Sequence, residues 1–350
     1  MALNASGPIS LAGSTTGQSI AVELGLGATT AISLNQAAVR TLAGIASGAI
    51  IMPTNFWGKS NTPTKKAIFG FGYSTAASAI TNLVSTTGVV AADQAAVTGT
   101  GRSGLGAAAY GTDKAIFGFG NDSVGATAVS NLVSNTGVVA TDTAGVGTGR
   151  PSLAAAGYGT DKAIFGYGST PVTSTTNLVS NTGVVAANTT GVGTARFSLA
   201  AAAYGTDKAI FGFGQTTASI RSAVTNLVSN TGVVAANQAA VTGTARSNPA
   251  AAGYGTDKAI FGFGATPTFS TIVNLVSNTG VVAANTSAGG SATISMAAAG
   301  YGVDTAIFGF GTTGAATAIT HLVSNAGVVA TNTAGVGTAR SGPAAASYSS

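Results

Sequence analysis

A sequence repeat that runs from residue 66 to the end of this 350-residue chain constrains its fold more than any other feature. The motif Lys-Ala-Ile-Phe-Gly-aromatic-Gly occurs five times, and a sixth copy, Thr305–Gly311, has threonine in place of lysine. The five complete copies begin at Lys66, Lys114, Lys162, Lys208 and Lys258. Successive copies start 46 to 50 residues apart. A fixed period of this length indicates a repeat architecture, in which each unit buries its apolar face against its neighbours.

Two further motifs recur in every copy and define the expected strands. Asn-Leu-Val-Ser precedes Gly-Val-Val in five copies, and in the sixth copy His321 replaces the asparagine. An alanine-rich run that ends in tyrosine follows, preceded by arginine in most copies, as in Arg102 to Tyr110. Short apolar segments between glycines and turn residues favour β-strands. With Thr143–Thr148 as the last strand of its copy, four short strands in about 40–50 residues match one blade of a β-propeller.

The order of the motifs predicts how the blades close. The first Ile-Phe-Gly strand, at residues 67–72, has no alanine-rich strand before it, and the last alanine-rich strand, Pro343–Tyr348, has no Ile-Phe-Gly strand after it. We therefore predict a mainly β chain whose residues 61–350 form a six-bladed β-propeller. Its C-terminal strand would pair with the first blade and so remove the open edges. Residues 1–60, which lack the repeat, are predicted to form a small α+β N-terminal module.

Composition argues against several classes of function. Only 7% of the residues are charged, there is no cysteine, and His321 is the one histidine. We therefore expect no catalytic residue, metal site or cofactor, and no enzymatic activity. The net charge is +5, but no basic run exceeds two residues, which argues against a nucleic-acid partner. Uncharged stretches are interrupted by Ser, Thr, Asn and Gly, so no membrane insertion is expected.

The repeat resembles the kelch repeat in the order of its parts. Arginine, a run of small residues, Tyr-Gly, a turn, Lys-x-Ile-Phe-Gly-x-Gly and Asn-Leu-Val follow one another as in that family, over residues 66–350. The double glycine of kelch repeats is split here, as in Gly118-Phe119-Gly120, and the only tryptophan, Trp57, lies outside the repeat. The resemblance implies a propeller and transfers no binding site.

Residues 1–60 have their own motifs. Ser33-x-x-Gln36 has the form of a capping box before an expected helix over residues 37–44, which ends at glycine. The segments Ile9–Leu11, Glu23–Gly25, Ile32–Asn35, Val39–Gly44, Ser47–Ile50 and Phe56–Ser60 resemble a short N-terminal module of tailed-bacteriophage structural proteins. The resemblance implies a virion component whose module attaches a distal domain to other tail, baseplate or virion proteins. The candidate docking residues are Leu34, Val39, Leu42, Phe56 and Trp57; the alternative for Phe56 and Trp57 is that they close the module's own core.

Residues that recur in most copies are better explained by the repeat than by a ligand. The arginines could form a ring that attracts anionic sugars, but we favour a role in bridging neighbouring blades. The Asp-Lys pairs, as at Asp113-Lys114, are typical of turns, and the tyrosines suit packing between blades better than stacking on sugars.

The loops after the Ile-Phe-Gly strands differ in length and sequence between copies. Loops on a rigid scaffold often carry recognition, so Asn121, Asp122, Arg221 and Phe269 are the candidate host-contact residues. The alternative is free drift of unconstrained loops. The expected function is that of a tail or baseplate fibre or adhesin, present in multiple copies on the virion, that contacts a host surface glycan or protein. The alternative is a decoration or spacer protein of the tail or capsid without a ligand.

Overall fold

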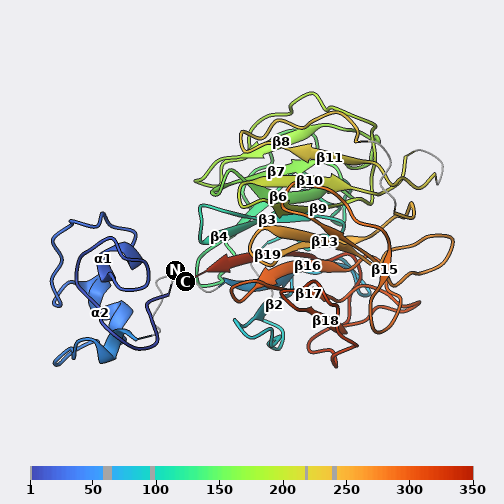
Figure 1. Ribbon diagram of the computed structural model, residues 1–350. Coiled ribbons are helices and arrows are strands. Elements are labelled where there is room, and N and C mark those ends of the chain that lie inside the picture. Colours follow the sequence, from blue (N-terminus) through green and yellow to red (C-terminus); the bar gives the residue numbers. More distant parts are fainter. Residues whose placement is uncertain (1, 58–64, 95–98, 217–219, 239–242, 350) are drawn as a thin grey trace. The chain divides into compact units, whose positions relative to one another are not determined.

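The computed structural model describes residues 2–57, 65–94, 99–216, 220–238 and 243–349 (Figure 1). The chain divides into two compact units, Met1–Pro63 (unit 1) and Thr64–Ser350 (unit 2), which are described separately. The domain boundary expected after residue 60 lies outside the described residues.

Unit 1 is a small unit with its own core. It contains the helices α1 (Ile20–Glu23) and α2 (Ala37–Ala43) and the 3₁₀-helix η1 (Thr54–Phe56). The predicted helix is confirmed, and it ends at Gly44, whose φ of 75° provides the left-handed C-terminal cap. The expected capping box is wrong, because the helix begins at Ala37 with Gln36 as N-cap and no side-chain cap hydrogen bond, although the Gln36 side chain accepts a hydrogen bond from the N–H of Ser33.

Unit 2 is all β in its described residues and contains six small antiparallel sheets, which we number in chain order. Sheet 1 combines β1 (Lys65–Gly70) and β2 (Thr81–Val84) with β19 (Ala344–Ser349), sheet 2 holds β3 (Gly106–Tyr110), β4 (Lys114–Gly118) and β5 (Ser130–Val133), and sheet 3 holds β6 (Ala154–Tyr158), β7 (Lys162–Gly166) and β8 (Thr176–Val179). Sheet 4 holds β9 (Ala200–Tyr204), β10 (Lys208–Gly212) and β11 (Thr225–Val228), sheet 5 holds β12 (Ala250–Tyr254), β13 (Lys258–Gly262), β14 (Ile272–Val276) and β15 (Thr286–Ser287), and sheet 6 holds β16 (Ala297–Tyr301), β17 (Thr305–Gly309) and β18 (Thr320–Val323).

The fourth strand predicted for each repeat is absent from the described residues of sheets 2, 3 and 6, and in sheets 1 and 4 the segment lies partly outside the described residues. Thr143–Thr148 forms no strand; Thr143 makes only an isolated bridge to Ser130, and of the described sheets only sheet 5 has a fourth strand. Gly147 has a φ of +88°, which interrupts the extended backbone before Thr148. The equivalent Gly290 of sheet 5 has a φ of +100°, and β15 is limited there to the two residues Thr286–Ser287 that precede it.

The C-terminal strand joins the first sheet, as the motif order predicts. β19 pairs antiparallel with β1, with Ser349 opposite Lys65 and Ala344 opposite Gly70. Figure 1 shows β19 in red beside the teal strands β3 and β4, although these strands lie at opposite ends of the repeat. The alanine-rich strand, which we call the first strand of each sheet (β19 in sheet 1), also contacts the first strand of the next sheet. The contacting pairs are β3–β6, β6–β9, β9–β12, β12–β16, β16–β19 and β19–β3.

Neighbouring sheets are joined by one aromatic pair at each junction. The phenylalanine of one Ile-Phe-Gly strand packs against the second aromatic residue of the preceding sheet, with ring centroids 5.1 to 5.2 Å apart. The pairs are Phe71–Phe117, Phe119–Phe165, Tyr167–Phe211, Phe213–Phe261, Phe263–Phe308 and Phe310–Phe69. The last pair connects sheet 6 with sheet 1.

Main-chain hydrogen bonds connect the sheets at both ends of their strands. At the end that carries the loops after β4 and its equivalents (the loop end), the N–H of Ser152 donates to the carbonyl of Gly104, and this pattern repeats from sheet to sheet. The series closes on itself, because the N–H of Gly104 in turn donates to the carbonyl of Gly342. In order of donation, its members are Gly104, Ser152, Ser198, Asn248, Ser295 and Gly342. At the opposite end (the hairpin end), the turn after the first strand of one sheet donates to the next turn, as from Gly111 to the carbonyl of Asp161.

Candidate functional site

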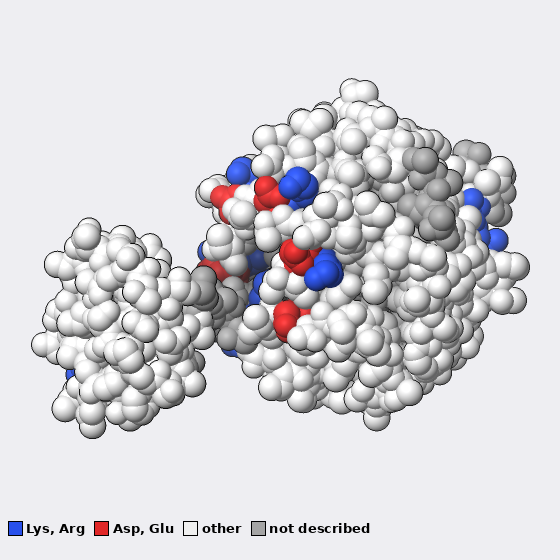
Figure 2. Space-filling model, viewed as in Figure 1, with Lys and Arg blue, Asp and Glu red and all other residues white. Residues whose placement is uncertain are grey.

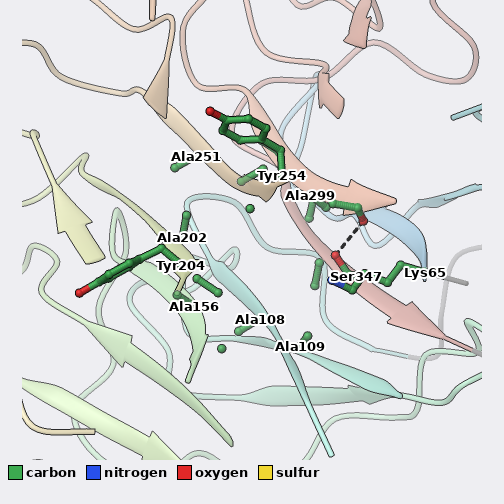
Figure 3. A pocket seen from close by; sticks show the side chains of 18 of the residues that line it. Lys65, Ala108, Ala109, Ala156, Ala202, Tyr204, Ala251, Tyr254, Ala299 and Ser347 are labelled. Carbon is green, nitrogen blue, oxygen red and sulfur yellow. Dashed lines mark hydrogen bonds between the residues drawn. The ribbon is translucent and has the colours of Figure 1, made fainter. Parts of the chain in front are cut away.

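The first strands of the six sheets surround an axial pocket of about 210 Å³ (Figure 3). β3, β6, β9, β12, β16 and β19 all contribute to its lining, almost entirely through alanine and glycine. Only small residues occupy the position of Gly300 in the six strands: its equivalents are Ala109, Gly157, Ala203, Gly253 and Ser347. The alanine-rich runs of the sequence therefore form the wall of this pocket.

Polar and charged residues surround the pocket toward the hairpin end. Lys65, Lys258 and Asp304 belong to the lining, together with threonines of the hairpin turns. Burial lowers the pKa of the Lys65 ammonium group. The hydroxyl of Ser347 donates a hydrogen bond of 2.7 Å to the carbonyl of Gly300 (Figure 3). An apolar wall with cations and one carboxylate suits the binding of a slender molecule with a polar end. Among the described residues, no three His, Cys, Asp or Glu side chains form a group that could hold a metal ion.

The repeated arginines lie inside the junctions between sheets. Each has 0 or 1% of its surface exposed and stacks on the second aromatic residue of the preceding sheet, with 3.9 to 4.9 Å between the guanidinium carbon and the ring centroid. The residues are Arg102, Arg150, Arg196, Arg246 and Arg340. This position supports the bridging role that we favoured and leaves no arginine ring at the surface.

The guanidinium groups of Arg150 and Arg340 donate hydrogen bonds to amide or carbonyl oxygens, and that of Arg102 lies 3.5 Å from the carboxylate of Asp142. Arg150 donates to the side-chain oxygen of Asn177 at 2.7 Å and to the carbonyl of Tyr167 at 2.6 Å, and Arg340 donates to Asn82 at 2.7 Å. Burial lowers the pKa of Arg150 and of Arg340 to about 10, so both remain charged at neutral pH. Cation–π contact with the ring below supplies the rest of the stabilisation.

One junction differs from the others at two positions at once. Before β16, Thr293 replaces the arginine, and in β18 of the same sheet His321 replaces the asparagine. The imidazole of His321 packs on Phe263, the ring that an arginine would otherwise cover, at 4.8 Å between centroids. His321 therefore fills the space of the missing guanidinium. It is fully buried, and burial lowers its pKa.

The Asp-Lys pairs lie in hairpin turns, as expected. Asp113 and Lys114 are 2.8 Å apart, and the equivalent pairs at Asp161, Asp207 and Asp257 are 3.0 to 3.4 Å apart. Figure 2 shows red and blue groups side by side on a surface that is otherwise mostly white. The tyrosines that end the first strands are buried, and Tyr110 packs against Gly183 of the next sheet.

The candidate host-contact residues all lie at the loop end. Asn121 is exposed, and Asp122 accepts hydrogen bonds from the backbone N–H groups of Val124 and Gly125, which shapes the loop tip. Phe269 is 38% exposed, whereas Arg221 is only partly exposed. The most exposed apolar side chains of these loops are Val124, at 96%, and Ile220, at 64%.

The candidate docking residues of unit 1 divide into two groups. Val39, Leu42 and Phe56 are buried in its core, and Leu34 packs against that core. Trp57 is 37% exposed, and its indole N–H donates to the carbonyl of Gly7 at 2.9 Å. Trp57 is therefore the member of the set whose side chain a partner could reach without a change in unit 1.

The comparisons with known proteins supply no family for this chain. No protein-family model matches the sequence, and no curated protein matches it. Among the described helices, none is both long and apolar enough to cross a membrane. The functional conclusion therefore rests on the residues and on their geometry.

Sequence reasoning did not identify the axial pocket or the coupled change at Thr293 and His321. The signal for the first was the small size of the alternate residues in each alanine-rich run. The signal for the coupled change was that the missing arginine and the missing asparagine flank the same Ile-Phe-Gly strand, Thr305–Gly309.

Proposed function

We propose that unit 2 is a six-bladed β-propeller closed by β19 and that it serves as a non-enzymatic binding domain of a tailed-bacteriophage virion protein. Three observations support the closed ring: the β19–β1 pairing, the Phe310–Phe69 contact, and the hydrogen bonds that return to Gly104. Each connects the last sheet or the last strand with the beginning of the repeat.

The loop end is the surface that we assign to recognition, and one observation carries this assignment. The six sheets repeat the same residues in their strands and junctions, but the loops at this end differ and present apolar side chains to solvent. Val124, Ile220 and Phe269 come from three different loops. Exposed apolar groups at variable tips on a constant scaffold are typical of a contact surface.

The assignment to a virion rests on unit 1. Its motifs resemble an attachment module of phage structural proteins, and Trp57 provides an exposed aromatic side chain for a partner. β1 begins at Lys65, at the hairpin end of sheet 1, so the loop end lies at the other end of the strands from the first described residue of unit 2.

Adsorption of the purified full chain to cells of the host bacterium tests the recognition surface. The variant V124S/I220S/F269S should lose at least tenfold in binding, because three apolar contacts are removed. The control V22S/I51S/V303S changes three exposed apolar residues away from the loop end and should bind as the original chain does. Equal binding by both variants would contradict the assignment of the loop end.

Immunogold labelling of purified particles tests the virion assignment separately. Label on the tail or baseplate agrees with the proposal, and particles without label contradict it. Label on the particle together with no binding of the chain to host cells would identify a decoration or spacer protein instead.

A further inference from the structure

Six residues at the loop end of the first strands are joined by main-chain hydrogen bonds, and four of them carry polar side chains. Each lies two residues before a first strand, and each N–H donates to the carbonyl of the preceding member at 2.7 to 3.4 Å. We call this set the loop-end collar. Its members are Gly104, Ser152, Ser198, Asn248, Ser295 and Gly342.

All six members of the collar share a backbone conformation that glycine adopts more readily than serine. Their φ angles lie between 52 and 61°. Residues with a side chain rarely take a positive φ, whereas glycine takes it without steric cost. Two sheets have glycine here, which shows that the fold accepts it, yet the other four sheets retain a serine or an asparagine. Backbone strain of this kind is typical of residues whose side chains have a function.

The side chains of these four residues have no structural partner within the described part of the chain. Ser152, Ser198, Asn248 and Ser295 are partly exposed, and their hydroxyl and amide groups make no hydrogen bond with another described residue. By contrast, the hydroxyl of Ser229 in the Asn-Leu-Val-Ser motif accepts two hydrogen bonds from the main chain of its own turn. The fold therefore uses the main chain of the collar and leaves its polar side chains to a ligand.

The residues immediately outside the collar are uncharged as well. The residue before each collar member forms main-chain hydrogen bonds with the start of a variable loop, as Ser341 does with Tyr73 and Ser103 does with Asn121. The six outer positions are Tyr73, Asn121, Ser169, Gln215, Ala265 and Thr312. Five of them have a side chain that can form hydrogen bonds, and none is acidic or basic. A ligand at this position would meet hydroxyl and amide groups rather than charges.

Tyr73 supplies an exposed aromatic side chain near the two glycines of the collar. Its side chain is 48% exposed, and two main-chain hydrogen bonds join Tyr73 to Ser341, the residue before Gly342. Gly342 and Gly104 are neighbours in the collar. Apart from its chain neighbours, a Cβ atom on Gly342 would meet one protein atom within 4 Å, the nitrogen of Gly104 at 3.6 Å. One side of the collar thus leaves room near an aromatic residue, and the other side carries four polar side chains.

We propose that the loop-end collar binds an uncharged sugar unit of a glycan on the host surface. The sugar hydroxyls would exchange hydrogen bonds with the serine hydroxyls and with the amide of Asn248, which can both donate and accept. The apolar C–H face of the sugar would cover the aromatic side chain of Tyr73. A few placed polar groups beside an aromatic surface are typical of sites for small ligands. This assignment rests on the recognition function proposed for the loop end and adds the chemical class of the ligand.

Adsorption of the full chain to host cells tests the assignment with a variant that preserves the fold. In S152G/S198G/N248G/S295G, every collar position has the residue that two sheets already contain. Its melting temperature should therefore stay within a few degrees of that of the original chain. We expect its binding to fall about tenfold or more, because the sugar loses several hydrogen bonds.

The matched control makes the same change at four exposed threonines of the hairpin turns, which also have a positive φ. This control, T112G/T160G/T206G/T256G, should bind as the original chain does. Mild periodate treatment of the cells, which cleaves the vicinal diols of sugars, should abolish binding, whereas protease treatment should leave it unchanged. An increase of about tenfold in ionic strength should change binding by less than about twofold, because the collar and its surroundings carry no charge.

The outcomes separate this assignment from the recognition function. No binding of the original chain to untreated cells would contradict both. Unchanged binding by the glycine variant, or an equal loss in the threonine control, would overturn the assignment of the collar alone. Binding that is removed by protease but not by periodate would identify a protein ligand, and binding that falls at high ionic strength would identify a charged one. Either of these results would overturn the assignment of an uncharged sugar.

Discussion

One glycine in each sheet determines how closely the next sheet can approach. A Cβ atom on Gly118 would lie 2.8 Å from the tip of the Phe165 ring, which belongs to the neighbouring sheet. The equivalent glycines, Gly70, Gly166, Gly212, Gly262 and Gly309, would meet a phenylalanine ring at 2.7 to 2.9 Å. The glycine that ends each Ile-Phe-Gly strand thus makes room for the aromatic pair that joins two sheets.

Gly118→Ala is predicted to destabilise unit 2 by about 1–3 kcal/mol, because a buried ring must move from its packed position. Gly157→Ala is the matched control, since alanine occupies the equivalent position at Ala109 and Ala203. Its free energy of unfolding should change by less than about 0.5 kcal/mol. Urea denaturation measures both values, and an equal loss in the two variants would show that the contact with Phe165 is not the cause.

The residue scale also shows what the sequence could not predict. The second aromatic residue of each motif has a φ of 60 to 64°, a conformation that bulky side chains rarely adopt. Phe119, for example, is held there by Phe165 and by the guanidinium of Arg150. Both partners come from the next copy of the repeat, so the local sequence carries no signal for this conformation.

At the scale of elements, two positions in each sheet change together: the arginine before the first strand and the asparagine of Asn-Leu-Val. Arginine and asparagine occur together at five junctions, and threonine and histidine occur together at the sixth. At the junction of sheets 5 and 6, the ring of His321 rather than a guanidinium covers Phe263. A single change at either position would leave a space or an unmatched buried group.

A double-mutant cycle tests this coupling. Thr293→Arg alone would bury a cation without its amide partner, and His321→Asn alone would uncover Phe263, so each should cost about 1–3 kcal/mol of unfolding free energy. The double variant T293R/H321N rebuilds the common junction and should recover most of that loss, with a coupling energy of about 1–3 kcal/mol. Strictly additive losses would contradict the pairing.

The original chain and the double variant T293R/H321N should differ in how their free energy of unfolding depends on pH. Burial lowers the pKa of His321 in the folded state, so the unfolded chain binds a proton more readily. The stability of the original chain should therefore be complete above the unfolded pKa of about 6.5 and fall as the pH drops below it. The double variant lacks this histidine, and its unfolding free energy should decline less between pH 7.5 and pH 5.5.

At the scale of elements, the sequence predicted the strands that carry strong apolar motifs. The Ala-Ile-Phe-Gly, Asn-Leu-Val and alanine-rich segments are all strands, and α2 ends at the predicted glycine. The expected fourth strand of six residues failed because a glycine at positive φ, Gly147, interrupts the extended backbone within it, and β15 of sheet 5 is only two residues long. The axial pocket could not be predicted, because its width depends on how closely six separate sheets pack.

For the whole molecule, the decisive sequence signal was the unmatched strand at each end of the repeat. It predicted the β19–β1 pairing from motif order alone, with no information on distances. The sequence did not predict that the side-chain and main-chain contacts between neighbouring sheets would also continue from sheet 6 to sheet 1. The aromatic pairs, the buried arginines and the two sets of main-chain hydrogen bonds each continue from sheet 6 to sheet 1.

The closed ring that we propose would explain the unusual composition better than any property of a single sheet. Glycine is needed at each junction and turn, and alanine is needed where six strands approach the axis. The buried guanidinium of Arg150 donates to main-chain and amide oxygens instead of pairing with a carboxylate.

Closure of the ring within one chain is the central claim, and an engineered disulfide tests it most directly. The chain has no cysteine, and Ala67 lies opposite Ser347 in the β1–β19 ladder. The variant A67C/S347C should oxidise within the monomer, seen by mass spectrometry, because directly opposed residues meet disulfide geometry. The control A67C/A345C, offset by two residues along β19, should stay reduced. A reduced A67C/S347C monomer, or disulfides found only between two chains, would contradict a ring closed by its own C-terminal strand.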